Sequence, residues 1–218
     1  MGERGVQVGG RAVLPGALRP WLGGIAGFGT VVLFGLGVLF AGDSRPGVVD
    51  LRVWAVVNGA APPWLYVAQA MDFLGEPVGA PLLVGAAVVG CLLLRRPRAA
   101  VLVVLGVGVT VGVAKVLKSL VGRTIHGDNL SFPSGHTAFF TSFALVVALL
   151  VAGWLRVGRT VGASLVLAST LLAAAVMGWA QVVLGAHYPT DVVGGWCTAV
   201  AVVPVVAWGV DRVADGRR

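Results

Sequence analysis

A histidine and an aspartate near the C-terminus have the types and spacing that nucleophilic chemistry requires. His187 and Asp191 bracket Pro189, which is disfavoured inside a helix but fits its first turn. If Asp191 lies where a helix opens, its carboxylate accepts a hydrogen bond from one nitrogen of His187 and leaves a lone pair on the other. Such an imidazole is a nucleophile or a base. A polar loop with a helix-capping Asp is the plainer alternative.

A second polar segment, Ser131–His136, separates two long apolar runs. We predict that Ser134 is the N-cap of the following helix, whose first-turn N–H groups and dipole favour phosphate. Gly135 permits a close approach of the backbone, and His136 stands beside any anion held there. An ordinary capped helix start would explain Pro133, Ser134 and Gly135 but gives no reason for His136.

Basic residues precede this segment at the end of another apolar run. Lys118 and Arg123 lie five residues apart, and a phosphate group needs several convergent donors. Lys115 lies one helical turn before Lys118 on the same face. A lysine at the end of a membrane span often only reaches for the interface, and this alternative stays open for Lys115.

The composition is that of an integral membrane protein. Of 218 residues, 57% are hydrophobic and only 11% are charged, and the mean hydropathy is +0.93. The net charge of +7 comes from short basic clusters beside apolar runs, which argues against nucleic-acid binding. Cys91 and Cys197 lie inside apolar segments without metal-type spacing, so we interpret them as small core residues.

The apolar runs predict an all-α, polytopic bundle of six transmembrane helices. These runs are Trp21–Ala41, Val78–Leu94, Ala99–Leu117, Thr137–Leu155, Val161–Leu184 and Val192–Val210. The first run is too long for a cleavable signal peptide, whose apolar core spans about 7–15 residues. Residues 1–20 are then an N-terminal tail that we expect to be loosely ordered, 21–210 the membrane domain, and 211–218 a C-terminal tail.

Residues 42–77 have a different character from the apolar runs. They combine charged residues, the pair Pro62-Pro63 and several aromatic side chains, and no window among them is long and clean enough to span. Aromatic residues suit a bilayer interface. We therefore predict one or two helices lying on the membrane.

Charge predicts the orientation. With both termini in the cytoplasm, eleven of the sixteen basic residues fall on the cytoplasmic side, as the positive-inside rule requires. The three histidines, His126, His136 and His187, then lie on the extracytoplasmic side, as do Lys118 and Asp191. We therefore expect an extracytoplasmic site in a multi-pass protein of the plasma membrane.

Taken together, three segments resemble the signature of the type 2 phosphatidic acid phosphatase superfamily, membrane lipid phosphatases that share their site with vanadium haloperoxidases. The segments are Lys118…Arg123, Pro133-Ser134-Gly135-His136 and Gly185-Ala186-His187-Tyr188-Pro189-Thr190-Asp191. By motif the resemblance covers residues 118–191, and the six-span layout extends it over most of the chain.

The resemblance implies a role for each matched residue. His187 would attack phosphorus to form a phosphohistidine, oriented by Asp191, and His136 would protonate the leaving oxygen. The phosphoryl oxygens would be held by Lys118, Ser134 and the Gly135 amide. No metal and no cofactor is implied, so we expect activity that survives chelators.

Two positions depart from the family pattern. Ile125 and His126 stand where Arg-Pro is usual, and Ala180 and Gln181 stand where Ser-Arg is usual. Arg123 matches a second arginine that many members carry. We hypothesise that Arg123 is the main phosphate clamp and Gln181 a neutral one, with Lys115 and His126 compensating for the lost arginines.

The expected function is hydrolysis of a lipid phosphomonoester or diphosphate of the polyprenyl phosphate, polyprenyl diphosphate or phosphatidate type. The alternative is a catalytically weakened relative that binds or translocates a phospholipid. The presence of His136, His187 and Asp191 favours an enzyme, because a binding module needs the cations but not a nucleophile, an acid and an orienting carboxylate. The lipid, the oligomeric state, the pH optimum and the role of residues 42–77 stay open.

Overall fold

The computed structural model describes residues 12–57 and 60–216, and the fold within them is helical, as predicted. A two-stranded antiparallel hairpin, β1 (Thr124–Ile125) and β2 (Asn129–Leu130), interrupts the helices. The helices are η1 (Gly16–Leu18), α1 (Arg19–Leu39), α2 (Val48–Val57), α3 (Pro62–Phe73), α4 (Gly79–Leu93), α5 (Pro97–Val121), α6 (Gly135–Leu155), α7 (Arg159–Val183) and α8 (Pro189–Gly216).

The long helices coincide with the predicted apolar runs. Among the described residues, five helical segments are long and apolar enough to cross a membrane: η1 with α1, and α5, α6, α7 and α8. The remaining run forms α4, which has 15 residues and is therefore short for a span. The multi-span helical architecture is thus confirmed, and the sixth span stays a prediction.

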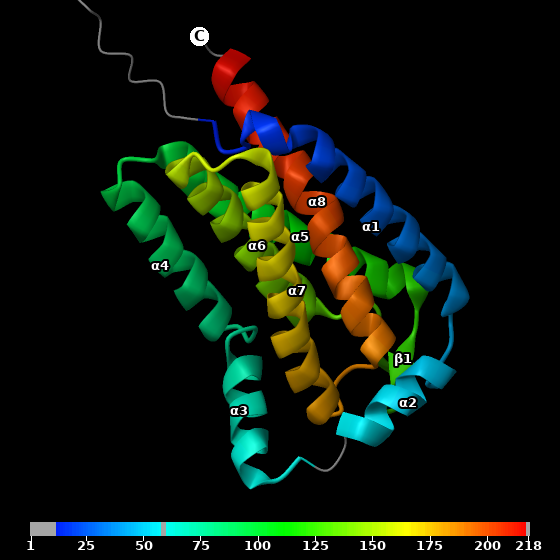
Figure 1. Ribbon diagram of the computed structural model, residues 1–218. Coiled ribbons are helices and arrows are strands. Elements are labelled where there is room, and N and C mark those ends of the chain that lie inside the picture. The colour runs from blue at the N-terminus through cyan, green and yellow to red at the C-terminus, as the bar shows by residue number, and fades with distance from the viewer. Residues whose placement is uncertain (1–11, 58–59, 217–218) are drawn as a thin grey trace, which may run out of the picture.

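The bundle is organised around α6, which packs against α5, α7 and α8, while α1 runs along α8 (Figure 1). Its core is built from aliphatic side chains with almost no exposed surface, among them Leu102, Leu145, Leu149 and Val203. Helix α3 packs against α7, where the rings of Trp64 and Trp179 meet edge to face at 6.3 Å.

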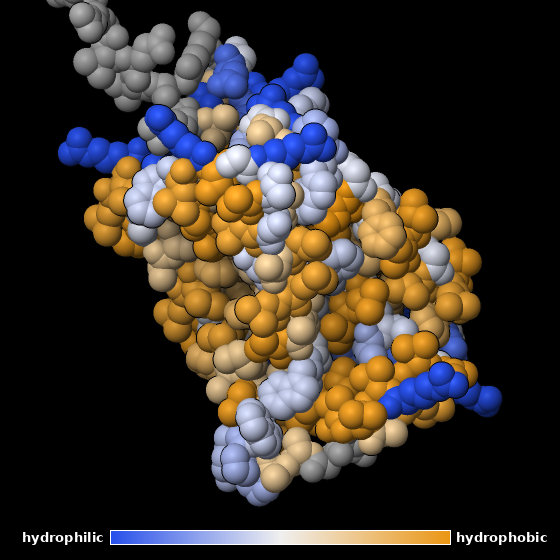
Figure 2. All heavy atoms as spheres, in the orientation of Figure 1, coloured by the Kyte–Doolittle hydropathy of each residue, from blue (hydrophilic) through white to orange (hydrophobic). Residues whose placement is uncertain are grey.

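On the face shown in Figure 2, hydrophobic residues cover the middle of the molecule, and hydrophilic residues gather at the end that holds the C-terminus. Large apolar side chains such as Phe34, Leu120 and Leu172 are exposed on the long helices, and Leu93 is exposed on α4. An apolar surface of this extent is typical of helices that contact lipid rather than water.

The N-terminal segment is packed from Val13 onward, although we expected residues 1–20 to be loosely ordered. The backbone N–H groups of Val13 and Leu14 each donate to the carboxylate of Asp211 at 2.9 Å, and both side chains are buried. Residues 1–11 lie outside the described part of the chain. The N-terminal segment is thereby fixed to the last turns of α8.

Residues 42–77 form two short helices, α2 and α3, as predicted. Both contact α7, and α2 also contacts α8. Their placement at a membrane interface remains a prediction.

Candidate active site

The segment around Ser134 has the local structure that the sequence predicted. Ser134 is the N-cap of α6, and its buried hydroxyl accepts hydrogen bonds from the Thr137 N–H at 3.3 Å and from the Thr137 hydroxyl at 3.0 Å. The Ser134 N–H donates to the backbone carbonyl of Asp191 at 2.9 Å. This bond joins the start of α6 to the start of α8 across more than fifty residues of sequence.

Two glycines allow α8 to approach this segment closely. A Cβ atom at Gly195 would lie 2.6 Å from the Ser134 carbonyl oxygen and 2.9 Å from the Thr137 Cβ, and one at Gly194 would meet the Phe132 ring. Only a residue without a side chain fits such contacts. By contrast, the space beside Gly135 is open.

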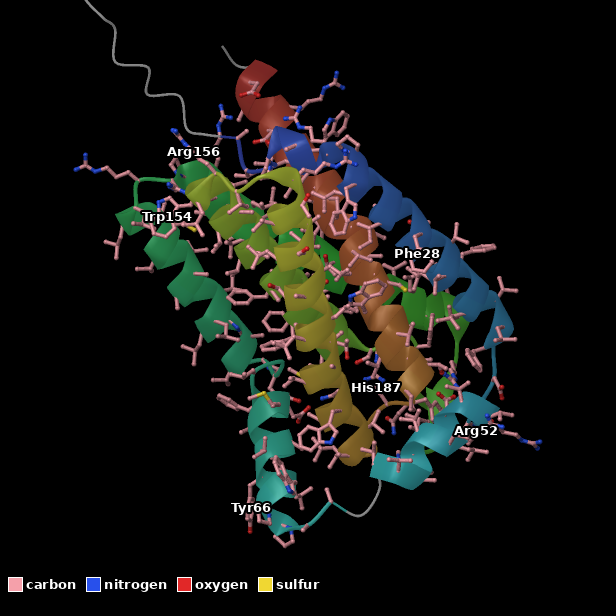
Figure 3. All side chains as sticks on the ribbon, in the orientation of Figure 1. Phe28, Arg52, Tyr66, Trp154, Arg156 and His187 are labelled. Carbon is pink, nitrogen blue, oxygen red and sulfur yellow. The ribbon has the colours of Figure 1, made fainter. Side chains whose placement is uncertain are left out.

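His187 lies in the turn between α7 and α8, at the end of the bundle away from Arg156 and Trp154 (Figure 3). Its side chain is 7% exposed, and its Nδ1 lies 3.7 Å from Oδ2 of Asp191, in the first turn of α8. This distance is longer than a hydrogen bond. The predicted position of Pro189 at the start of a helix is confirmed.

The environment of His187 favours a neutral imidazole. Burial is the main cause that lowers its pKa below the ordinary 6.5, and the positive charges of Lys118 and His136 act in the same direction. The negative charge of Asp191 opposes them and raises this pKa. Because Nδ1 faces Asp191, the lone pair available for attack is on Nε2.

Arg123 lies inside the protein rather than facing an open phosphate site. Its side chain has no exposed surface, and Nη1 donates to Oδ1 of Asp191 and to Oγ1 of Thr190, both at 2.6 Å. Nη2 donates to Oδ2 of Asp50 at 2.8 Å. Arg123 is thus an internal partner of Asp191, in contrast to the main phosphate clamp that we expected from the sequence.

The guanidinium of Arg123 is also held between two aromatic rings. Its Cζ lies 3.8 Å from the Phe40 ring centroid and 4.4 Å from that of Tyr188. These stacking contacts and the two carboxylates hold the guanidinium in place.

Lys118 remains a candidate phosphate ligand. It lies in the last turn of α5, and its ammonium donates to the Leu130 carbonyl at 2.9 Å, which leaves two N–H donors. Its positive charge acts on His187 and interacts with that of Asp191. Lys115 is exposed one turn earlier on α5.

His136 faces two carboxylates that sequence reasoning did not assign to the site. Its Nε2 lies 3.4 Å from Oδ1 of Asp72 and 3.4 Å from Oε1 of Glu76. Gly75 packs against the imidazole so closely that a Cβ would lie 2.9 Å from its Cγ. The sequence does show two acidic residues, Asp72 and Glu76, in the segment 42–77 that is too polar to span a membrane. Nothing in the sequence indicates that they contact His136 rather than another histidine.

Gln181, the residue in place of a family arginine, bonds to one of these carboxylates. It is almost fully buried, and its Nε2 donates to Oδ1 of Asp72 at 2.7 Å. The structure thus gives Gln181 a protein partner where a phosphate clamp was expected.

The ligand atoms of Asp72, Glu76 and His136 all lie within 4.8 Å of one another, a grouping that could hold a metal ion. Carboxylate and imidazole groups are suitable ligands for several divalent ions. The absence of a metal requirement therefore stays a prediction.

His126 contacts the turn between α7 and α8 that holds His187. It is exposed, and its Nε2 is 2.9 Å from the Gly185 carbonyl. It borders a cavity of about 100 Å³ that also touches His187. The other lining residues are Pro46, Asp50, Trp54, Ile125, Gly185, Tyr188 and Pro189.

Comparisons with known proteins bear on the family and on the fold. The sequence profile of the PAP2 superfamily matches residues 99–214, which is more than half of the chain and includes all three motif segments. Among solved structures, the first transmembrane PAP2 type phosphatidylglycerolphosphate phosphatase from Bacillus subtilis superimposes with a TM-score of 0.65. The match has 23% sequence identity and covers 84% of this chain and 96% of that chain.

The search of curated proteins found no match. At 23% identity, the solved structure supports the fold only, whereas the family profile supports membership of the family. The resemblance inferred from the three segments is confirmed: the chain belongs to the PAP2 superfamily of membrane phosphatases.

Proposed function

We propose that this protein is a membrane lipid phosphatase that passes a phosphoryl group first to His187 and then to water. The observation that carries the proposal is a buried His187 whose Nδ1 lies 3.7 Å from Asp191 and whose pKa is lowered by burial, which favours a neutral ring with its lone pair on Nε2. In the first step the Nε2–P bond forms while the bond from phosphorus to the lipid oxygen breaks. His136 gives its proton to that oxygen.

The second step reverses the role of His136. It takes a proton from water as the water oxygen attacks phosphorus, and the Nε2–P bond breaks to release inorganic phosphate. The charge of His136 acts on His187, which supports their use on one phosphoryl group.

The phosphoryl oxygens are held by Lys118, by the first-turn N–H groups at Gly135 and by the hydroxyl hydrogen of Ser134. The Ser134 oxygen already accepts two hydrogen bonds, so its hydrogen is the group left to donate. Lys115, one turn from Lys118, adds positive charge at the approach to the site.

A lipid substrate is supported by an apolar cavity of about 430 Å³ between α1 and α5. Leu33 and Phe34 line it on α1, and Leu117 and Leu120 line it on α5. Phe132, two residues before Ser134, also lines it. We infer that an acyl or prenyl chain lies in this cavity while its phosphate reaches the site.

Three classes of lipid fit this geometry: polyprenyl phosphates or diphosphates, phosphatidate, and phosphatidylglycerol phosphate. The last is the substrate named for the Bacillus subtilis protein of similar fold. A soluble phosphate ester has no part that would use the apolar cavity.

We place the site on the extracytoplasmic face of the plasma membrane, with both termini in the cytoplasm. The arginine-rich end of the bundle, which includes Arg156, lies opposite His187 (Figure 3). Positive residues favour the cytoplasmic side.

The scheme needs no metal, because acid, nucleophile and anion donors are all side-chain or backbone groups. The cluster of Asp72, Glu76 and His136 gives this point a direct test. Turnover that is unchanged in EDTA supports the scheme, and turnover that requires an added divalent ion contradicts it.

The alternative is a weakened family member that binds or moves a phospholipid. It is favoured by one observation: Arg123 and Gln181, expected as clamps, bond to Asp50, Asp191 and Asp72 instead. Lipid binding without phosphate release by the purified protein would support it.

The deciding assay is phosphate release from a panel of phosphatidate, phosphatidylglycerol phosphate and farnesyl diphosphate in mixed micelles. Wild-type protein is expected to release phosphate from at least one, and His187→Ala from none. Equal release by the two proteins would contradict the proposal.

A further inference from the structure

Asp50 is a buried carboxylate outside the three motif segments. It lies in the first turn of α2 with 1% of its surface exposed. Its Oδ2 accepts from Arg123 Nη2 at 2.8 Å and from the Gly47 N–H at 2.9 Å. Its Oδ1 accepts from the N–H and the hydroxyl of Thr190 at 2.9 and 2.8 Å. Four donors therefore hold this carboxylate in place.

These contacts make Asp50 the outer member of a chain of charges that ends at the nucleophile. The order is Asp50, Arg123, Asp191 and His187, with nearest-atom distances of 2.8, 2.6 and 3.7 Å. All four side chains are buried, and charges interact more strongly there than in water.

The net charge of Asp50, Arg123 and Asp191 matters for His187. Arg123 alone would cancel the negative charge of Asp191 and leave His187 beside a neutral pair. With Asp50 included, two carboxylates and one guanidinium carry a net charge of −1. A neutral imidazole that keeps its Nδ1 proton becomes positive when Nε2 bonds to phosphorus, so it needs that negative charge nearby.

We propose that Asp50 is a positioning residue that balances Arg123, so that Asp191 keeps a net negative charge for His187. The inference rests on the proposed phosphatase chemistry and extends it to a residue that touches neither substrate nor nucleophile. It also gives a reason why Arg123 is paired with two carboxylates.

The other charged groups around His187 determine in which direction its protonation should change when the Asp50 charge is lost. Lys118 from α5 and His136 from α6 disfavour its protonation, and Asp191 from α8 favours it. Asp50, His126 and Tyr188 line the cavity beside it. Loss of the Asp50 charge would leave Arg123 less balanced and so would disfavour the positive imidazole further.

The test compares Asp50→Asn with wild type. We expect the acid limb of kcat/KM to move to lower pH by about half to one pH unit, and the plateau value to fall roughly tenfold. Asp43→Asn is the matched control, because Asp43 lies in the preceding loop and its carboxylate accepts from the Arg45 N–H rather than from Arg123. Its acid limb should match the wild type.

A double variant separates charge balance from packing. Asp50→Asn with Arg123→Met removes one charge of each sign and leaves Asp191 as the remaining −1. Its acid limb should return toward the wild-type position. Thr190→Val, which removes hydroxyl contacts to Asp50 and Arg123 but no charge, should lower Tm without moving the limb.

A second readout does not depend on turnover. Modification of His187 by diethyl pyrocarbonate, followed by mass spectrometry across pH, reports the neutral imidazole directly. A pH midpoint of modification that is lower in Asp50→Asn than in wild type, and that returns toward the wild-type value in the double variant, supports the inference. An unchanged midpoint in Asp50→Asn overturns it, whereas the proposed phosphatase function is decided separately by wild type against His187→Ala.

Discussion

Gly75 lies against the imidazole ring of His136 beside its Cδ2, so that a Cβ at position 75 would be 2.9 Å from the ring Cγ and 3.0 Å from Nε2. A residue from the segment between α3 and α4 therefore limits where the proposed general acid can stand. Any side chain at this position must displace either the ring or the segment.

Gly75→Ala should lower kcat by roughly a hundredfold, the size of effect expected when a general acid is misplaced. Phosphate release at saturating substrate measures it. Gly85→Ala is the matched control, because nothing lies within 4 Å of a Cβ there. If Gly75→Ala turns over at the wild-type rate, His136 is not held by this contact.

The pH profile follows from the neutral state of His187. Its pKa is lowered from 6.5, chiefly by burial, so kcat/KM should rise with pH as the ring loses its proton, with a midpoint below 6.5. The unfolded chain binds this proton at about 6.5 and the folded protein only at lower pH. Folding stability from this group is therefore retained above pH 6.5 and lost as pH falls below it. An acid limb centred above 6.5 would contradict the assignment.

The neighbours of Gln181 predict how a restored arginine behaves. Gln181→Arg places a guanidinium beside Asp72, which now accepts from Nε2 at 2.7 Å. The new arginine should pair with Asp72 and change kcat/KM little. With Asp72→Asn added, it is free for a phosphoryl oxygen, and kcat/KM should rise by about tenfold or more. An equal gain in the single variant would show that Asp72 does not compete.

The close approach of α8 to the start of α6 gives a prediction on stability. Gly195→Ala should lower the unfolding free energy by about 1–3 kcal/mol through overpacking and should shift Ser134. Thermal unfolding in detergent and phosphate release measure the two effects. Gly209→Ala on the same helix, where a Cβ meets nothing within 4 Å, should be neutral in both.

The sequence predicted local features well. Apolar runs located the long helices, because length and hydropathy are properties of one segment. Ser134 as an N-cap and Pro189 at a helix start follow from backbone chemistry within a few residues, and both are confirmed. The three motif segments were sufficient to indicate the family, which the profile match over residues 99–214 confirms.

Contacts between distant segments could not be predicted. The bond from Arg123 to Asp50 joins residues 73 positions apart, and the sequence suggested a phosphate as the partner of Arg123 instead. The approach of Asp72 to His136 depends on how α3 packs against α7, through contacts such as Trp64 with Trp179. The residue types and spacing within one segment do not specify which distant segment it will contact.

The central claim is that His187 carries the phosphoryl group. The direct measurement is to quench turnover of a ³²P-labelled panel lipid with alkali, which preserves phosphohistidine, and to map the label by mass spectrometry. The account predicts label on His187 and none in His187→Ala. Label on another residue, or full turnover by His187→Ala, would contradict it.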